Sequence, residues 1–413
     1  MTSPDESSTT AGEPTGAPPL TGVRVLDVGT LLAGPVAATF LGDFGAEVIK
    51  VEQPGRGDTL RGSPRDGKPG RSTSWMVEGR NKKSVTINLR VSEGQALLRE
   101  LAATADVLIE NFTPGTMEGW GLGWADLHEL NPRLIMTRVS GWGQVGPYAN
   151  RPGYDRIALG FSGYMYPTGF PDRIPVRPAF PTADYNSAAF AAMATMFALY
   201  ERDANGGEGQ MIDLALYEAP FRITGDLVAG FARHGRIRER VGNRNENFTP
   251  AGTFTTADGR YVQIAAGGDK VWTRLASAIG RQDLADDPGL ERGRDRNDRA
   301  DELEGILSDW VGRHDFAEVE QTLVDAGVPV GGIYTPDQIV DDPHYAARKN
   351  VLTVDDETLG PFPMPNVVPT LSATPGRVDF AGVELGTHTD EVLGDVLGRS
   401  PADLDRLRTD GVI

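Results

Sequence analysis

The sequence predicts an α/β protein with a large domain around a parallel sheet and a second, smaller α+β domain. Two observations lead to this fold class. Short β-branched runs alternate with helical segments from residue 23 to residue 216, and short connections join them, as in parallel α/β units. After about residue 230 the chain becomes rich in charged and turn-forming residues, and a hairpin followed by helices replaces the alternation.

The first α/β unit begins with a buried type of strand at 23–28, followed by a turn and by apolar residues at helical spacing over 36–44. A second strand follows at 46–51. The same patterns predict further strands at 84–89, 106–110, 134–140 and 211–216, and helices at 92–103 and 181–201.

The second region begins with a hairpin at 253–265, whose turn carries the Asp258-Gly259 pair typical of tight β-turns. Later elements are expected as helices at 271–279, 299–311 and 316–326, a strand at 330–334, a proline-rich stretch at 361–375 and a helix at 389–397. These patterns divide the chain into a disordered tail at 1–19, a large domain at 20–230, a linker at 231–247, a small domain at 248–335 and a final segment at 336–413.

Composition excludes several classes of protein. The 413 residues include 58 Asp and Glu against 40 Lys and Arg, a net charge of −18, so the chain lacks the basic balance of a nucleic-acid binder. Cysteine is absent, which excludes disulfides, thiolate metal sites and a cysteine nucleophile. No apolar run approaches the ~20 residues of a membrane span, and the N-terminus has no signal-peptide pattern. We therefore expect a cytoplasmic protein that binds neither nucleic acid nor membranes.

Cofactor and metal motifs are also missing from the sequence. The 5 histidines are scattered without metal-ligand spacing, so we expect no metal site. The glycines after the first strand form neither a dinucleotide-binding fingerprint nor a P-loop, which makes a nucleotide cofactor a weak interpretation.

Asp184 is the most informative ionisable residue. It lies at the start of the alanine-rich helix predicted at 181–201. One interpretation is an N-cap, because aspartate accepts hydrogen bonds from the first N–H groups of a helix. The other is a carboxylate nucleophile in a partly apolar pocket. The local sequence favours the cap, and the two roles do not exclude each other.

Two pairs of neighbouring residues are further candidates. Tyr154 and Asp155 follow a turn, where they would bring a phenol and a second carboxylate near the first. Asn111 and Phe112 come directly after the strand predicted at 106–110, and parallel sheets hold ligands at the carboxyl ends of their strands.

Lys82 and Lys83 belong to the densest basic cluster in the first half of the chain, Arg80-Asn81-Lys82-Lys83. A solvated charged run is the default interpretation of such a cluster, and an anion-binding site is the alternative.

Together these segments resemble the family III CoA-transferases, the CaiB/BaiF family. The resemblance runs from about Leu20 to the C-terminus and covers nearly the whole chain. It is carried by motifs in the family's order and spacing: LTGVRVLD at 20–27, AGP at 33–35, GDFGAEVIKVE at 42–52, NKKS at 81–84, IENFTPG at 109–115, LNP at 130–132, PGYD at 152–155, TADY at 182–185 and LGTHTDEVL at 385–393.

The resemblance implies an enzyme that moves CoA from an acyl-CoA donor to a carboxylic acid acceptor. In this family an aspartate attacks the donor thioester to form a mixed anhydride, and CoA then converts the anhydride into an aspartyl-CoA thioester. The position that matches this nucleophile is Asp184, which outweighs the cap interpretation. CoA and acyl-CoA would then be substrates, with no tightly bound cofactor.

Architecture and CoA contacts also follow from the resemblance. It implies a Rossmann-like large domain built from both chain ends, to which 336–413 would return, and a homodimer of two interlocked chains. Asn111 and Phe112 match a segment that lies along CoA, and Tyr154 and Asp155 match a second one.

The residues expected to bind the CoA phosphates depart in part from the family's pattern. The resemblance makes Lys82 and Lys83 candidates for the phosphates. Some family members carry arginine where this chain has Gln53 and Gly119, and Trp120 would compensate by stacking.

The main alternative is an α-methylacyl-CoA racemase of the same superfamily. Racemases exchange a proton with a His–Asp pair, and Tyr154 stands at the histidine position here, beside Asp155. A phenol with an ordinary pKa near ~10 is a poor base at neutral pH, which favours transfer. A non-catalytic CoA-binding protein is the third interpretation.

The sequence offers candidates for the carboxylic acid that accepts CoA and does not select one of them. The segments 161–164 and 178–185 are closest to the carnitine-type branch, whose acceptors are betaine-like acids. Aromatic faces bind quaternary amines, and Tyr164, Tyr166 and Tyr185 are the rings expected to do so.

Overall fold

The computed structural model describes residues 16–62, 70–245 and 248–413, and these form two compact units. The first unit comprises the chain up to Tyr164 together with Pro178–Gly225 and Ala346–Ile413. The second comprises Met165–Arg177 and Asp226–Tyr345. The short segment 165–177 therefore groups with the second unit, a division that the sequence patterns do not indicate. Most of the tail expected at 1–19 lies outside the described residues.

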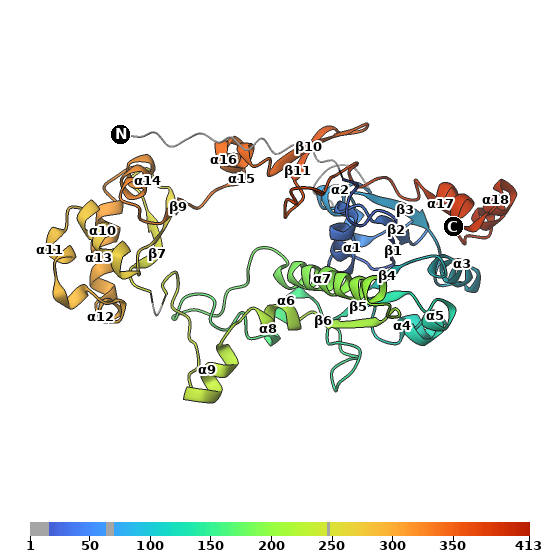
Figure 1. Ribbon diagram of the computed structural model, residues 1–413, viewed down its shortest axis with the longest axis horizontal. Helices are drawn as coiled ribbons and strands as arrows, with labels where there is room; N and C mark the ends of the chain where they lie inside the picture. The colour runs from blue at the N-terminus through green and yellow to red at the C-terminus, as the bar shows by residue number, and fades with distance from the viewer. Residues whose placement is uncertain (1–15, 63–69, 246–247) are drawn as a thin grey trace. The chain divides into compact units, whose positions relative to one another are not determined.

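The first unit is built on a six-stranded sheet in the order β3-β2-β1-β4-β5-β6, and every neighbouring pair is parallel (Figure 1). All six strands were predicted, with shifts at their ends: β1 (Arg24–Asp27), β2 (Glu47–Glu52), β3 (Lys82–Thr86), β4 (Val107–Glu110), β5 (Ile135–Ser140) and β6 (Met211–Ala215). This order reverses between β1 and β4, as in doubly wound nucleotide-binding sheets.

Helices cover both faces of this sheet: α1 (Ala33–Asp43), α3 (Ser92–Ala102), α7 (Thr182–Ala204), α17 (Thr389–Leu397) and α18 (Pro401–Thr409). On one face α1 and α7 pack against each other and over β4 and β5. On the other, α3, α17 and α18 share a hydrophobic core with Leu26 and Leu108. The C-terminal helices thus complete the domain that the N-terminal strands begin.

Short helices fill the connections, and the sequence patterns do not predict them: η1 (Thr59–Gly62), α2 (Thr73–Glu78), α4 (Thr116–Gly119), α5 (Trp124–Leu130), α6 (Asp155–Phe161) and α8 (Glu218–Arg222). None has more than 7 residues, about two turns, which is too short for apolar spacing to identify a helix. Part of the proline-rich stretch forms β11 (Gly360–Pro365), which pairs antiparallel with β10 (Val351–Asp356). Proline fits such a ribbon because an outer edge needs no N–H donor.

The second unit contains an antiparallel sheet in the order β7-β8-β9. The predicted hairpin forms β7 (Ala251–Thr255) and β8 (Tyr261–Ala265), and β9 (Val330–Gly332) lies beside it. Its helices are α9 (Leu227–His234), α10 (Asp269–Ala278), α11 (Gln282–Ala285), η3 (Pro288–Leu290), α12 (Gly293–Asn297), α13 (Ala300–Val311), α14 (Phe316–Asp325) and α15 (Pro336–Asp341), followed by α16 (Pro343–Ala347) at its end. Among the helices of the described segments, none is long and apolar enough to cross a bilayer.

Candidate functional site

A pocket of about 400 Å³ opens at the carboxyl ends of the parallel strands in the first unit. Segments that follow β1, β2, β3 and β4 line it, so it lies where the strand order reverses. Parallel α/β sheets bind ligands at this point because the chain segments diverge there and leave a crevice. The walls include the apolar side chains of Val28, Ile87, Leu89, Phe112 and Trp120.

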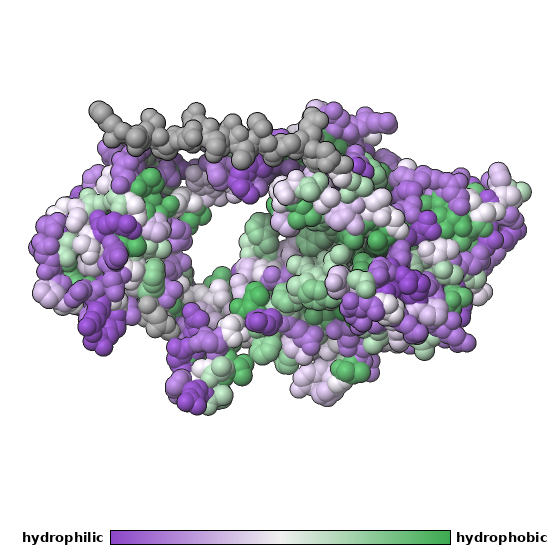
Figure 2. Space-filling view, viewed as in Figure 1, coloured by the Kyte–Doolittle hydropathy of each residue, from purple (hydrophilic) through white to green (hydrophobic). Residues whose placement is uncertain are grey.

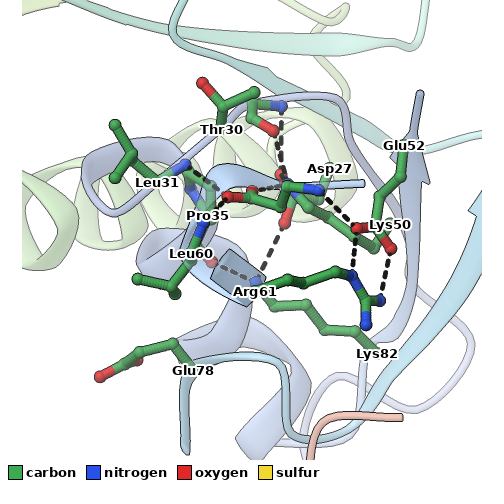
Figure 3. Close-up of polar contacts among 12 residues, drawn as sticks. Asp27, Thr30, Leu31, Pro35, Lys50, Glu52, Leu60, Arg61, Glu78 and Lys82 are labelled. Carbon is green, nitrogen blue, oxygen red and sulfur yellow. Dashed lines mark hydrogen bonds and ion pairs between the residues drawn. The ribbon is translucent and has the colours of Figure 1, made fainter. Parts of the chain in front are cut away.

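A buried ionic cluster, formed by Asp27, Lys50, Asp58 and Lys82, adjoins this pocket. Lys50 Nζ lies 3.3 Å from Asp27 Oδ1 and 3.1 Å from Asp58 Oδ2, and Lys82 Nζ lies 3.0 Å from Asp27 Oδ2 (Figure 3). Burial lowers the pKa of Lys50, but the carboxylates of Asp27 and Asp58 outweigh burial and hold that pKa above its ordinary value. Burial lowers the pKa of Lys82 below its ordinary range, although Asp27 opposes the shift.

This cluster fixes the loop that follows β1. Lys50 Nζ donates to the backbone carbonyl of Gly29 in the loop, and Asp58 Oδ1 accepts from Leu31 N at 3.0 Å. Asn111, just after β4, binds the same loop twice: its Oδ1 accepts from Thr30 N at 2.8 Å, and its Nδ2 donates to Thr30 O at 2.7 Å. These bonds hold Leu31 at φ 64°, a left-handed conformation that costs a non-glycine residue about 1–2 kcal/mol.

The two predicted residues after β4 have different surroundings. The side chain of Asn111 is engaged with the loop after β1, so it shapes one rim of the pocket. Phe112 lines the pocket, and its ring meets that of Trp120 edge to face with centroids 5.4 Å apart. The two rings form an aromatic wall.

Asp184 lies in the first turn of α7 and is not its cap. Asp155 takes that role, because its Oδ1 accepts from Ala183 N at 2.7 Å and from Asp184 N at 3.4 Å. The carboxyl oxygens of Asp184 have no hydrogen-bond partner among the described residues. Burial and then the charge of Asp155 raise the pKa of Asp184 to about 7. The structure thus brings these two predicted carboxyl groups together and leaves the one on Asp184 unpaired.

The surroundings of Asp184 include a residue that sequence reasoning missed. Tyr185 OH donates to Glu78 Oε1 at 2.8 Å, which links the start of α7 to the end of α2. Burial raises the pKa of Glu78, although the bond from Tyr185 opposes the shift. Tyr154, in contrast, is 69% exposed just before α6. No local pattern marks Glu78, since its partner lies 107 positions away.

The basic cluster at 80–83 is not the solvated run expected by default. Arg80 and Lys82 are buried, and Arg80 Nε donates to Asp43 Oδ1 at 2.9 Å. Lys83 forms ion pairs of 2.9 Å with Glu47 and with Glu391. Neither lysine lines the strand-end pocket. The default interpretation fails for Arg80 and Lys82 because neighbouring elements cover their strand.

Two exposed arginines that sequence reasoning missed do line the pocket: Arg56, which follows β2, and Arg90, which follows β3. A usable signal was present, because both come shortly after predicted strands. Gln53, one of the positions where arginine is missing, lines the same pocket, and so does Trp120.

The described site offers two chemical features. One is a carboxyl group with unpaired oxygens, which suits covalent acyl transfer. The other is an apolar crevice with two guanidinium groups, which suits an anionic ligand with an aromatic part. Within 16–62, 70–245 and 248–413, no three potential metal ligands gather in a binding arrangement.

Comparisons with known proteins agree with one another. The pattern of CoA-transferase family III matches residues 20–389. Succinyl-CoA–D-citramalate CoA-transferase of Chloroflexus aurantiacus is 44% identical over 395 residues, which cover 96% of this chain and 98% of the relative. The β subunit of succinyl-CoA–L-malate CoA-transferase from the same organism is 43% identical over 401 residues, with the same coverage of 96% and 98%. The crystal structure of a CaiB/BaiF family protein from Brucella suis matches with a TM-score of 0.81 at 31% identity, covering 92% of this chain and 100% of that one.

Proposed function

The chain belongs to CoA-transferase family III, and from this premise we propose that it transfers CoA from succinyl-CoA to a hydroxylated dicarboxylic acid. The relatives compared above are named for succinyl-CoA with citramalate or malate, and both of these acids are 2-hydroxy dicarboxylic acids. Identities of 43–44% over nearly complete chains support the same substrate class here. These relatives favour a dicarboxylic acceptor over the betaine-like acid expected from the sequence.

Asp184 is the nucleophile in this proposal. One Oδ atom attacks the carbonyl carbon of the donor thioester, the C–S bond breaks, and CoA leaves as a thiolate. The thiolate attacks Cγ of the resulting mixed anhydride and releases succinate, which leaves an aspartyl-CoA thioester. The acceptor carboxylate then attacks the same Cγ and displaces the thiolate, and the thiolate takes the acceptor acyl group from the second anhydride. The steps regenerate Asp184 and involve no net oxidation.

The observation that carries this role is the unpaired state of the Asp184 carboxyl group. The buried aspartates of the first unit are engaged: Asp27 accepts from Lys82, Asp43 from Arg80, Asp58 from Leu31 N, and Asp155 from the start of α7. A half-buried carboxyl group without partners is costly to keep ionised, and such perturbed groups concentrate at functional sites.

The proposal assigns the nucleotide end of CoA to the strand-end pocket, which Phe112 lines and whose rim loop is held by Asn111. Tyr154 and Asp155 belong to the acyl end, because Asp155 contacts the backbone of Asp184. Lys82 and Lys83 lie outside the pocket lining and are paired with Asp27 and Glu47, so the proposal gives them no role in phosphate binding.

We also propose that the chain works as an interlocked homodimer. Exposed apolar side chains follow one face of α7 at helical spacing: Ala189, Met193, Met196, Phe197 and Tyr200. Hydrophobic residues gather over this helix in Figure 2. Large exposed apolar faces mark protein interfaces, and a relative named as a β subunit supports assembly from more than one chain.

Covalent trapping tests the mechanism. Incubation with succinyl-CoA and no acceptor, followed by hydroxylamine and peptide mass spectrometry, should convert Asp184 to its hydroxamate. Wild-type protein incubated with free CoA alone should show no modification of Asp184. The Asp184→Asn variant incubated with succinyl-CoA should show no modification at position 184. A label on another residue, or turnover without any label, would overturn the assignment.

An acceptor screen tests the substrate class. Malate and citramalate should accept CoA faster than glutarate or carnitine. Transfer to carnitine alone would overturn the dicarboxylic assignment and leave the mechanism standing. Exchange of the substrate α-proton with deuterated water in the absence of an acceptor would instead indicate the racemase.

A further inference from the structure

The strand-end pocket carries an excess of positive charge although the whole chain has a net charge of −18. Its two acidic lining residues are neutralised by partners, since Glu52 is 2.7 Å from Arg61 and Asp58 is 3.1 Å from Lys50. The exposed side chains of Arg56 and Arg90 have no hydrogen bond or ion pair with any described residue. Two guanidinium groups without a partner among the described residues therefore remain at the pocket.

The side chains that line the pocket indicate which chemical class of ligand fits it. Phe112 and Trp120 form an aromatic wall, and Ile87 and Leu89 add apolar surface. A flat heterocycle fits against such a wall. Guanidinium groups bind phosphates through two parallel N–H···O bonds and are less hydrated than ammonium groups, so they suit a phosphate at a partly open rim. The ligand is therefore expected to combine an aromatic ring with a phosphate group.

We propose that Arg56 and Arg90 together bind the ribose 3′-phosphate of CoA, and that they replace the arginines missing at Gln53 and Gly119. This inference rests on the proposed function, because it takes CoA thioesters as the substrates. It adds a specificity: the enzyme distinguishes CoA thioesters from dephospho-CoA thioesters, which share every other group. Arg56 lies in the segment after β2 and Arg90 in the segment after β3. Because β2 and β3 are neighbours in the sheet, both side chains line the same pocket.

The test compares kcat/KM for succinyl-CoA with kcat/KM for succinyl-dephospho-CoA, in the wild type and in Arg56→Ala, Arg90→Ala and the double variant. The wild type should favour succinyl-CoA by about 100-fold, since each charge-assisted bond to a phosphate is worth about tenfold. Each single variant should lose about tenfold of this preference, mainly through KM, and the double variant should show nearly none. Raised ionic strength should also reduce the wild-type preference.

Arg133→Ala is the matched control. Arg133 is an exposed arginine just before β5, at the amino edge of the sheet, and its removal lowers the net charge equally. It should leave the preference unchanged. Equal losses on both substrates in the Arg56 and Arg90 variants, or no loss at all, would overturn the inference. If the wild type transfers CoA and labels Asp184 but accepts both thioesters equally, only this inference fails. If the wild type neither transfers CoA nor labels Asp184, the proposed function itself fails.

Discussion

In the proposed mechanism, the carboxyl group of Asp184 meets two opposing requirements. A nucleophile must be ionised to attack a thioester, yet burial and the nearby charge of Asp155 both favour its protonated form. A carboxylate with a higher pKa is more basic and less hydrated, and this makes it a better nucleophile once it is ionised. Its pKa of about 7 places the balance near neutrality.

The reaction rate should therefore depend on pH. With a pKa of about 7, half of the Asp184 groups are ionised at neutral pH and about one-tenth are ionised one unit below it. We expect kcat/KM for succinyl-CoA to rise about tenfold per pH unit below neutrality and to level off above it. A pH–rate profile checks this expectation, and a flat profile between pH 5 and pH 8 would contradict it.

The variant Asp155→Asn distinguishes the effect of burial on the pKa of Asp184 from the effect of the Asp155 charge. Asparagine keeps an oxygen for the N–H groups of Ala183 and Asp184, so the cap on α7 survives. Loss of the Asp155 charge should lower the pKa of Asp184 and move the rising part of the profile to lower pH. Because burial is the larger cause, the pKa should stay above the ordinary value of 3.8. A profile that does not move would show that Asp155 has no electrostatic role.

The same group makes stability depend on pH. The folded state holds the Asp184 proton up to about pH 7, whereas the unfolded chain releases it near the ordinary value of 3.8, so its contribution to stability falls as pH rises through this window. Asp184→Asn removes the titration. We expect this substitution to stabilise the protein, relative to wild type, by about 3 kcal/mol more at pH 8 than at pH 5, as measured by urea unfolding. An equal effect of the substitution on stability at pH 5 and at pH 8 would mean that the pKa of Asp184 is not raised.

The buried ionic cluster connects β1, β2 and β3. Asp27 ends β1, Lys50 belongs to β2 and Lys82 to β3. The Asp27 carboxylate therefore joins three strands that lie side by side in the order β3-β2-β1. Lys82 Nζ also donates to the carbonyl of Pro35 in α1 at 2.6 Å. The cluster thereby fixes the strand ends from which the pocket loops leave.

Lys82 and Lys83 are a matched pair for testing this cluster. They are neighbours on β3 and point to opposite faces, one buried and one partly exposed. Lys82→Met should destabilise the protein by about 3–5 kcal/mol because it leaves Asp27 without one of its cations, whereas Lys83→Met should cost about 1 kcal/mol or less. Urea unfolding measures both. If Lys82→Met does not fold, addition of Asp27→Asn should restore folding, and failure to do so, or equal costs for both lysines, would contradict this account.

The strands of the sheet could be predicted from the sequence, and Asp184 could be selected there as the candidate nucleophile, whereas the long-range partners of these residues could not be predicted. Each parallel strand has its own short run of apolar or β-branched residues, and Asp184 stands in a family motif. The cap that Asp155 gives to α7 joins residues 28 positions apart, and no local pattern records that contact. The burial of Lys82 was hidden because a charged residue near the start of a strand is typical of a solvated edge. Parallel sheets are nonetheless covered on both faces, and here α1 covers that side.

At the scale of the whole molecule, the exposed apolar face of α7 concerns how chains assemble. Phe197 is 65% exposed, and the neighbouring methionines and tyrosine extend the same stripe. Such a face would favour aggregation in a free monomer, so the proposal of a homodimer gives it a partner of matching chemistry.

Interlocking makes a prediction that simple packing does not. Two chains threaded through each other separate only if one of them unfolds, so exchange of subunits requires crossing the unfolding barrier. Two differently tagged copies should form mixed dimers when they are expressed together, and none when the purified dimers are mixed at room temperature for a day. Tandem affinity purification followed by mass spectrometry measures the mixed species.

Refolding the mixture from urea should restore mixed dimers and serves as the positive control. Rapid exchange on mixing would indicate a dimer that is packed but not interlocked, and the absence of mixed species after co-expression would show that the face of α7 has another partner.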